Sequence, residues 1–260
     1  MALLRDWLQR PGLLHLHLDF DGTVVPIVAD PDRCWLDPPR RELLLQLVQH
    51  PRLAVAIVSG RSLADLERRL ALPGLALAGN HGLEIACGDR RWCHPQALRL
   101  VPLLREMAAR AELQLAEIPG AWVENKTLSL SLHSRRVLPP WRPELQQRLQ
   151  QLQAEWAAHP AVMARHGKQV LELRPALRWS KASASRWLQC RHPSPQGEGL
   201  FYAGDDDSDE DVFRAFPAAI SVRIAADGGV AGLPTAARFQ LPDSGALVRL
   251  LAQLLQELQH

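Results

Sequence analysis

Two aspartates separated by one residue, Asp19 and Asp21, follow the apolar run Leu13–Leu18 in the sequence Asp-Phe-Asp-Gly-Thr. Carboxylates at positions i and i+2 are costly on a buried strand. At a strand's C-terminal end, where Gly22 permits a sharp turn, both can enter the crevice where α/β sheets place their chemistry. An aspartate there can form an aspartyl-phosphate, and both residues can hold a divalent cation. Because Asp and Gly also form ordinary turns, this segment alone leaves a structural explanation open.

Three further polar clusters stand at the ends of other predicted elements. Ser59 follows an apolar run, Lys181 stands at the head of a predicted helix, and the acidic run Asp205–Asp211 follows Gly204 at a strand-to-helix turn. Each has a structural explanation of its own: a turn, a solvated helix residue, and acids that complement a helix dipole. Parallel strands bring their carboxyl ends to one edge of a sheet. The joint occurrence of all the clusters at element boundaries therefore favours a catalytic site.

The charges of such a site predict a metal ion. Asp19, Asp21, Asp205 and Asp209 packed together would repel one another, and without compensation some of them would bind protons. The Lys181 ammonium and a divalent cation would offset them, and Mg²⁺ favours carboxylates, waters and a phosphate oxygen. We expect Asp19, the backbone carbonyl of Asp21, and Asp205 to bind Mg²⁺ directly. Asp209 is expected to contact these ligands without binding the ion itself.

This arrangement suits phosphoryl transfer, which needs in-line positioning and charge neutralisation. A dianionic phosphate would bind between Mg²⁺, Lys181, Ser59 and loop amides. Asp19 would attack phosphorus. Asp21 would protonate the leaving alkoxide and then deprotonate the water that hydrolyses the aspartyl-phosphate. We expect Thr23 to support Asp21 or the phosphate.

The elements that position these residues read as an α/β core. Apolar runs alternate with helical patterns in the first third, which is typical of βαβ units and a parallel sheet. The predicted elements there are strands at Leu13–Leu18, Leu53–Val58 and Leu75–Ala78 and helices at Arg40–Gln49 and Ser62–Leu70. Ser62 is the expected N-cap of its helix, with Asp65 as its capping-box partner.

The pattern changes in the middle of the chain and then returns to α/β. The middle part contains predicted helices at Leu98–Leu115 and Pro143–His159, an alternating strand at Leu128–His133, and a hairpin of Val162–Arg165 and Gln169–Leu173 around a turn that includes Lys168. The last part contains predicted helices at Ser183–Leu188, Asp209–Ala215 and Gly245–Leu258 and strands at Leu200–Ala203 and Ala219–Ile224. We therefore expect residues 1–97 and 178–260 to form a Rossmann-like catalytic core with a parallel sheet, interrupted by an inserted α+β cap domain at 98–177.

The composition is that of an ordinary soluble globular protein. Of the 260 residues, 47% are hydrophobic and 22% are charged, and the net charge of +2 gives no indication of nucleic-acid binding. The four cysteines have no metal-binding spacing and are expected to be reduced thiols. Neither a signal peptide at Met1–Arg10 nor a membrane helix is expected. These features predict a cytoplasmic protein, and we expect a monomer that binds neither membrane nor nucleic acid.

The four clusters together resemble the motifs of haloacid-dehalogenase-type phosphatases. Within that superfamily the chain resembles the trehalose-6-phosphate phosphatase family. The segments that carry this closer resemblance are Val58–Arg61, Gly79–Glu84, Val123–Lys126 running into Leu130–Arg135, Leu171–Pro175, and Gly204–Phe213. The resemblance implies a core with a cap that closes over the site, and Mg²⁺-dependent hydrolysis of trehalose 6-phosphate to trehalose and phosphate.

The resemblance also implies a set of sugar-binding residues. They are expected at Gly60, Arg61, Asn80, His81, Gly82 and Glu84 of the core edge, and at Glu124, Lys126, His133, Arg135, Glu172 and Arg174 of the cap. The alternation of Ser129, Ser131 and His133 agrees with a polar sheet face that offers donors and acceptors to hydroxyls. His133 and Ser131 each also fit a plain solvent-facing strand position.

The sequence departs from the family pattern at three places and leaves two alternatives open. Asn125 stands where Asp is frequent, Ala182 where Gly is common, and Ser208 where Thr is usual. Only Asn125 changes a charge, and it bears on sugar binding rather than on phosphate chemistry. One alternative is a phosphatase for another sugar phosphate, such as sucrose phosphate or mannosylglycerate phosphate. The other is a non-catalytic regulatory module, which would normally lack one of the Asp, Ser or Lys residues present here.

Overall fold

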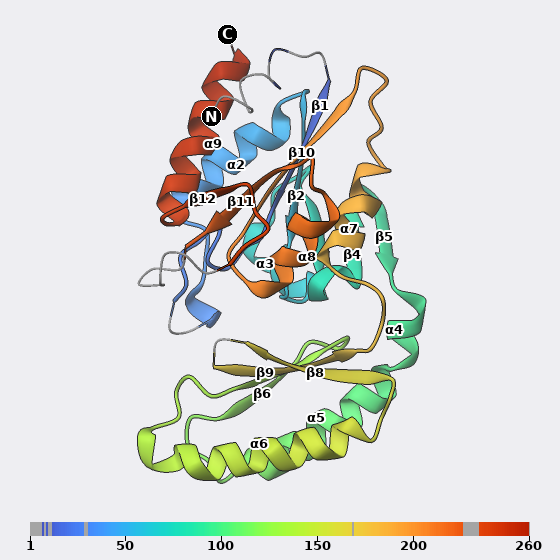
Figure 1. Cartoon of the computed structure of the whole chain (residues 1–260), viewed down its shortest axis with the longest axis vertical. Helices are drawn as coiled ribbons and strands as arrows, with labels where there is room; N and C mark the ends of the chain where they lie inside the picture. The colour runs from blue at the N-terminus through green and yellow to red at the C-terminus, as the bar shows by residue number, and fades with distance from the viewer. Residues whose placement is uncertain are drawn as a thin grey trace. The chain divides into compact units, whose positions relative to one another are not determined.

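The strand that precedes the Asp pair, β1 (Leu13–Leu18), lies inside an eight-stranded sheet in the computed structural model (Figure 1). The strand order is β12 (Phe239–Leu241), β11 (Ile220–Ile224), β10 (Glu198–Gly204), β1, β2 (Leu53–Val58), β3 (Ala76–Gly79), β4 (Glu84–Cys87) and β5 (Arg90–Cys93). Pairing is parallel from β12 to β3, and β4 is antiparallel to β3. Because β1 pairs with both β2 and β10, three polar clusters follow adjacent strands.

The chain forms two compact units. One combines Met1–Trp92 with Trp179–His260, and the other is Cys93–Arg178. The structure describes residues 7 and 9 and the ranges 12–28, 31–167, 169–225 and 234–259. In the first unit, the two ends that lead to the second lie together, since the rings of Trp92 and Trp179 are 4.7 Å apart.

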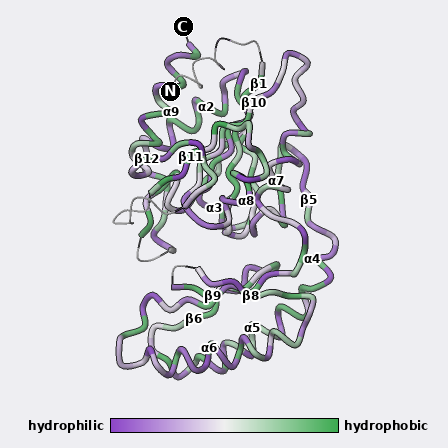
Figure 2. The backbone as a smooth tube through the Cα atoms, in the orientation of Figure 1, coloured by the Kyte–Doolittle hydropathy of each residue, from purple (hydrophilic) through white to green (hydrophobic). Residues whose placement is uncertain are grey.

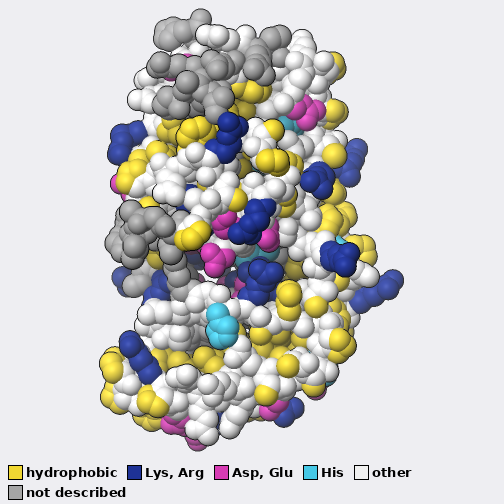
Figure 3. Space-filling view, viewed as in Figure 1, with side chains coloured by type: hydrophobic (Ala, Val, Ile, Leu, Met, Phe, Trp, Pro, Cys, Tyr) yellow, Lys and Arg dark blue, Asp and Glu magenta, His cyan; other side chains and the backbone are white. Residues whose placement is uncertain are grey.

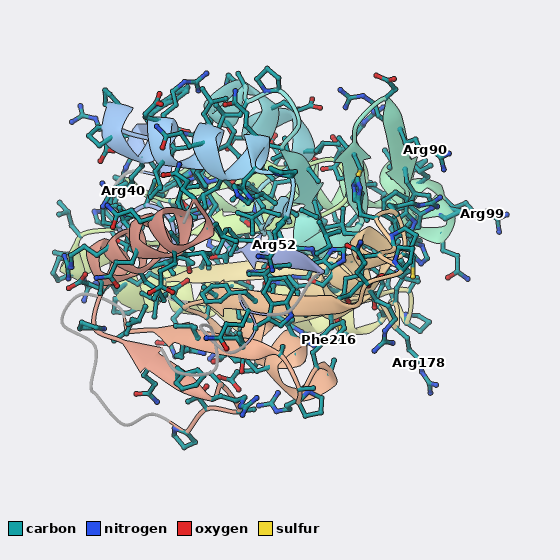
Figure 4. The ribbon with its side chains drawn as sticks, turned by 90° about the horizontal axis from the view of Figure 1, so that it is seen from above. Arg40, Arg52, Arg90, Arg99, Arg178 and Phe216 are labelled. Carbon is teal, nitrogen blue, oxygen red and sulfur yellow. The ribbon has the colours of Figure 1, made fainter. Side chains whose placement is uncertain are left out.

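Helices cover both faces of the large sheet. The buried side chains of Leu14, Leu16 and Leu18 on β1 belong to the apolar core that also contains residues of α2 (Pro38–Gln49), α3 (Leu63–Leu70) and α9 (Ser244–Gln259). The other face packs against α7 (Lys181–Gln189) and α8 (Asp207–Ala215). Arg186 of α7 lies 5.3 Å from the ring centre of Phe216, which ends α8 and is labelled in Figure 4. The first unit is thus an α/β/α sandwich, and Figure 2 shows hydrophobic colour along its central strands.

The second unit is a four-stranded antiparallel sheet backed by two long helices. The strand order is β6 (Trp122–Asn125), β7 (Leu130–His133), β9 (Val170–Pro175) and β8 (Val162–Gly167). Leu130, Leu132, Leu171 and Leu173 form one core with apolar residues of α5 (Val101–Leu115) and α6 (Arg142–Ala157). In Figure 2 these helices alternate between purple and green, as expected of helices with one buried face.

The predicted fold class is confirmed: a parallel-dominated Rossmann-like core contains an inserted α+β unit. The hairpin of β4 and β5 and the short strand β12 were not predicted, because none carries a long apolar run. The predicted helix at Leu98–Leu115 is wrong at its start, since α4 (Pro95–Arg99) ends before Leu100 and α5 begins at Val101. Pro102 explains the break, because a proline in a helix interior lacks the N–H that the helix needs.

The start of α7 and the capping of α3 also differ from the expectation. Helix α7 begins at Lys181 rather than Ser183, because Ser180 and Ser183 form a capping box. Ser62 caps α3 by accepting from the Asp65 N–H at 3.3 Å. The carboxylate of Asp65 does not return this bond and instead pairs with arginines. The predicted turn residue Lys168 lies outside the described residues.

Two histidines are buried on β1. His15 and His17 alternate with the leucines and therefore face the α7 and α8 side of the sheet. Their ring centres are 5.8 Å apart. Burial lowers the pKa of His17 from 6.5 to about 3, with a smaller contribution from His15. Below pH 6.5 the unfolded chain therefore binds a proton at this position that the folded chain does not.

We predict that this buried imidazole makes the protein less stable as pH falls from 6.5 towards 3. The free energy of unfolding should fall by up to about 1.4 kcal/mol per pH unit from this one proton. His17→Leu should remove that component, so its loss of stability between pH 6.5 and 5 should be smaller by about 1–2 kcal/mol. Urea unfolding at several pH values measures it, with the exposed His159→Gln as control. Parallel stability–pH curves for His17→Leu and the wild type would contradict the prediction.

Candidate active site

The predicted convergence of polar clusters is present at the C-terminal edge of the large sheet. Asp19 follows β1, Ser59 follows β2 and Asp205 follows β10, and all three side chains are buried. One carboxylate oxygen from each of Asp19, Asp205 and Asp209 lies within 4.8 Å of the others. The parallel register produces this arrangement, because β1 lies between β2 and β10.

Lys181 is the positive charge of this cluster. Its Nζ lies 2.8 Å from Asp19 Oδ1 and 2.9 Å from Asp209 Oδ1, and the side chain is 1% exposed. Burial alone would lower the pKa of Lys181, but the two adjacent carboxylates raise it well above its usual value. Burial raises the pKa of Asp19 well above its usual value, and Lys181 opposes that shift. The ammonium thus stays charged beside Asp19.

Asp209 holds Lys181 rather than facing outward. Its Oδ1 accepts from the Tyr202 hydroxyl at 2.7 Å as well as from Lys181, and its Oδ2 accepts from the Asp206 N–H at 3.1 Å. Burial raises the pKa of Asp209 to about 7, against the opposing effect of Lys181. Asp206 is the N-cap of α8 and accepts from the backbone and hydroxyl of Ser208. Tyr202 was not predicted as a site residue, although the alternation of β10 could have placed it on this face.

Glycine is required where the backbone approaches the carboxylates. Gly22 has φ +79°, and a Cβ there would lie 2.5 Å from Asp205 Oδ2. A Cβ on Gly204 would lie 2.1 Å from the Asp209 carboxyl carbon. Both glycines therefore let carboxylates approach the turns that follow β1 and β10.

Asp21 faces a different partner from Asp19. Its two carboxylate oxygens accept from Arg61 Nε at 2.6 Å and from Arg61 Nη2 at 2.7 Å. Arg61, expected to bind sugar, is thus part of a bidentate pair in this structure. Among the described residues, the buried Thr23 hydroxyl has no hydrogen-bond partner, so the expected bond from Thr23 to Asp21 is not present.

The turn after β3 lies beside the Ser59 loop. The Ser59 hydroxyl accepts from the Arg61 N–H at 3.2 Å, and the His81 N–H donates to the Ser59 carbonyl at 2.9 Å. The His81 ring lies so close to Gly60 that a Cβ there would be 2.6 Å from it. Gly60 and His81, two of the expected substrate-binding residues, therefore belong to the same edge as Ser59.

Three other expected substrate-binding residues hold this turn in place. The Glu84 carboxylate accepts from Asn80 Nδ2 at 2.6 Å and from the Leu63 N–H at 2.7 Å, which ties the turn to the start of α3. The Gly82 carbonyl accepts from Trp179 Nε1 at 2.7 Å. Contact of Asn80, Gly82 or Glu84 with a sugar stays a prediction.

Five of the six expected cap residues form one network on the small sheet. His133 Nε2 lies 2.8 Å from Glu124 Oε2. Lys126 Nζ lies 4.0 Å from Glu124 Oε2 and 3.4 Å from Glu172 Oε1. Arg174 Nε donates to Glu172 Oε2 at 2.6 Å. The sixth residue, Arg135, lies two positions beyond the end of β7 and is half-buried.

Comparison with known proteins decides the family. The trehalose-phosphatase family model matches residues 17–244, which include the small sheet and all of the large sheet except the first four residues of β1. The chain belongs to the trehalose-phosphatase family. It is 34% identical to a trehalose-phosphate phosphatase of Mycobacterium tuberculosis over 275 aligned residues, covering 100% of this chain and 68% of that protein. The chain thus spans about two thirds of this relative's length.

Solved structures agree on the fold. The C-terminal domain of a C. albicans trehalose-6-phosphate phosphatase superposes with a TM-score of 0.81 at 21% identity, covering 98% of this chain and 96% of that one. A haloacid dehalogenase-like hydrolase from Bacteroides thetaiotaomicron gives 0.61 at 15% identity, covering 93% and 99%. The resemblance inferred from the sequence is confirmed, and so is the prediction of an enzyme of the phosphoric monoester hydrolase class.

The acidic cluster of this trehalose-phosphatase family member fits a divalent cation. Among the described residues, three buried carboxylates, those of Asp19, Asp205 and Asp209, lie around the Lys181 ammonium, so negative charge is in excess. Oxygen ligands of this kind suit Mg²⁺. Since both oxygens of Asp209 accept hydrogen bonds, Asp19 and Asp205 are the side chains best placed to bind the ion directly.

The viewed surface carries side chains of both charges (Figure 3). Figure 3 shows acidic and basic side chains interspersed over the viewed face. None of the helices in the described part of the chain has the length and apolar character that crossing a bilayer requires. The predicted cytoplasmic location and monomeric state stay predictions.

We predict that Tyr202→Phe destabilises the protein. The substitution keeps the ring but removes a hydroxyl that donates to the buried Asp209 carboxylate. The loss of a hydrogen bond to a buried charged group should lower the free energy of unfolding by about 1–3 kcal/mol. Urea unfolding at pH 8 measures this change. An unfolding free energy equal to that of the wild type would show that the bond contributes nothing.

Proposed function

We propose that this chain hydrolyses trehalose 6-phosphate to trehalose and phosphate through an aspartyl-phosphate on Asp19, with Mg²⁺ as cofactor. The observation that carries the proposal is the buried Lys181 ammonium, bonded to Asp19 at 2.8 Å beside the carboxylates of Asp205 and Asp209. Membership of the trehalose-phosphatase family and the trehalose-phosphate phosphatase relatives support the substrate.

The first half of the reaction uses both aspartates of the first turn. A carboxylate oxygen of Asp19 attacks phosphorus, and the bond between phosphorus and the sugar oxygen breaks. Asp21 gives its proton to the departing oxygen, which leaves as the trehalose hydroxyl. Lys181 and Ser59 bind the phosphoryl oxygens. Mg²⁺, held by Asp19, Asp205 and the Asp21 carbonyl, would supply charge neutralisation at the phosphate.

The second half returns the enzyme to its starting state. Asp21, now ionised, takes a proton from a water molecule, whose oxygen attacks the phosphorus of the aspartyl-phosphate. The bond between phosphorus and the Asp19 oxygen breaks, and inorganic phosphate leaves. The sequence of steps consumes one water and regenerates the protonated Asp21.

We assign sugar recognition to the inserted unit, as a cap domain. Its polar network contains the carboxylates of Glu124 and Glu172, which accept hydrogen bonds, and the Lys126 ammonium and His133 ring, which can donate them. Sugar hydroxyls are both donors and acceptors and require this kind of mixed surface. Arg135 and Arg174, with Arg61, Asn80, His81 and Glu84 of the core, complete the proposed set.

Two alternatives are separable from this proposal. A phosphatase for sucrose phosphate or mannosylglycerate phosphate would keep the same core and differ in the sugar contacts. A regulatory module would keep the fold without the chemistry, but Asp19, Asp21, Ser59, Lys181 and Asp205 are all present, which argues against it.

The proposed substrate and nucleophile are tested by phosphate release. The wild type should release phosphate from trehalose 6-phosphate faster than from sucrose 6-phosphate or glucose 6-phosphate, and only with Mg²⁺. Asp19→Asn should lower kcat by on the order of 10⁴-fold or more, because it removes the nucleophile. Asp207→Asn, an exposed acid near the same site, is the control and should retain activity. Comparable rates on all three sugar phosphates would refute the assignment of trehalose 6-phosphate as the substrate. An active Asp19→Asn variant would refute the assignment of Asp19 as the nucleophile.

Metal binding has a test that does not depend on turnover. Mg²⁺ at about 100 times its Kd should stabilise the folded wild type by about 2.7 kcal/mol, seen as a higher melting temperature. Asp205→Asn should lose most of this shift, since it removes a proposed ligand, whereas Asp207→Asn should keep it. Equal shifts in the wild type and Asp205→Asn would remove Asp205 from the metal site.

A further inference from the structure

A series of four side chains of alternating charge begins at Asp21 and continues through the first unit. Arg61 binds both oxygens of Asp21, and its Nη1 donates to Asp65 Oδ2 at 2.7 Å. The same oxygen accepts from Arg69 Nε at 2.7 Å. The series Asp21, Arg61, Asp65, Arg69 thus contains two carboxylates and two guanidiniums, each joined to the next by a direct hydrogen bond.

The far end of this series is fixed to the backbone. Arg69 is 1% exposed, and its Nη1 donates to the carbonyls of Cys34 at 2.7 Å and Asp32 at 3.2 Å. Its guanidinium lies 4.8 Å from the ring centre of Trp35. Arg69 and Asp65 are one helical turn apart on α3, so Asp65 is held both by its helix and by an anchored neighbour.

At the Asp21 end of the series, the orientation of Arg61 depends on Asp65. The Arg61 guanidinium lies 5.7 Å from the ring centre of Phe20 and has carboxylates on two sides, Asp21 on one and Asp65 on the other. A guanidinium is a planar fork, so fixing one nitrogen on Asp65 fixes the direction of the other two. The arginines hold the pKa of Asp65 at about 2, despite its burial, so this residue is an anion at neutral pH.

We propose that Asp65 is a positioning residue for phosphoryl transfer: through Arg61 it sets the direction of the Asp21 carboxyl, while itself touching neither substrate nor metal. The inference rests on the proposed function, in which Asp21 passes a proton to the leaving group. Asp65 stands at the capping-box position of α3 but leaves that bond unmade. Its carboxylate is instead committed to Arg61 and Arg69.

Proton donation matters most for poor leaving groups, and this provides the test. Phenolate is a poorer leaving group than p-nitrophenolate, and neither phenyl phosphate nor p-nitrophenyl phosphate carries a sugar. In Asp65→Asn, kcat/KM should fall about 10- to 100-fold for phenyl phosphate and less than about threefold for p-nitrophenyl phosphate. A merely structural role of Asp65 would lower both values equally.

Arg68→Gln is the matched control. Arg68 also pairs with Asp65, but it is 65% exposed and is not part of the series that leads to Asp21. Both of its kcat/KM values should stay within about threefold of the wild type. Equal falls on the two substrates in Asp65→Asn, or no fall on either, would overturn the proposal.

Two further variants keep the test decisive. If melting shows that Asp65→Asn does not fold, Arg61→Lys, which keeps the charge but loses the fork, should show the same selective fall. An unchanged ratio there would overturn the proposal. In an Asp21→Asn background, adding Asp65→Asn should leave the ratio of kcat/KM for the two aryl phosphates unchanged. The wild type could fail to hydrolyse trehalose 6-phosphate while Asp65→Asn still changes the ratio of kcat/KM for phenyl phosphate to kcat/KM for p-nitrophenyl phosphate. That result would refute the proposed sugar substrate and support the positioning role of Asp65.

Discussion

The buried ammonium of Lys181 is the interaction on which the site depends. Removing a charge from water costs several kcal/mol, and an ammonium in this position is stable only because Asp19 and Asp209 lie within hydrogen-bond distance. The dependence is mutual, since without Lys181 the carboxylates would be buried without compensation. Tyr202 and the Asp206 N–H then fix Asp209, so the charge balance extends into β10 and the first turn of α8.

The two aspartates of the first turn are held by different means. Asp19 contacts a buried lysine at the start of α7, whereas Asp21 contacts an arginine from the loop after β2. One side chain is therefore fixed in a water-poor cluster, and the other, 39% exposed, lies at its border. This difference in surroundings supports the proposed roles of Asp19 as nucleophile and Asp21 as proton carrier, because the proton carrier has to reach the water molecule that it deprotonates.

The core of the site could be predicted from the sequence because its residues follow apolar runs. Asp19, Ser59 and Asp205 come directly after strands, and the parallel pairing of β1 with β2 and β10 brings them together. Tyr202 was missed because its role depends on which face of β10 meets α8. The Arg61–Asp65 pair was missed because Asp65 fits a helix cap equally well, and a sequence does not show which partner a carboxylate selects.

The rings of Trp92 and Trp179, whose centres are 4.7 Å apart, mark where the chain leaves the first unit and where it returns. Because those two points are in contact, Cys93–Arg178 is inserted into the first unit in the way that a long surface loop would be. Insertions at such sites disturb a host fold little, since the ends that they join are already neighbours. The edge of the large sheet and the inserted unit can therefore change independently in evolution, and one such core can carry different inserted units.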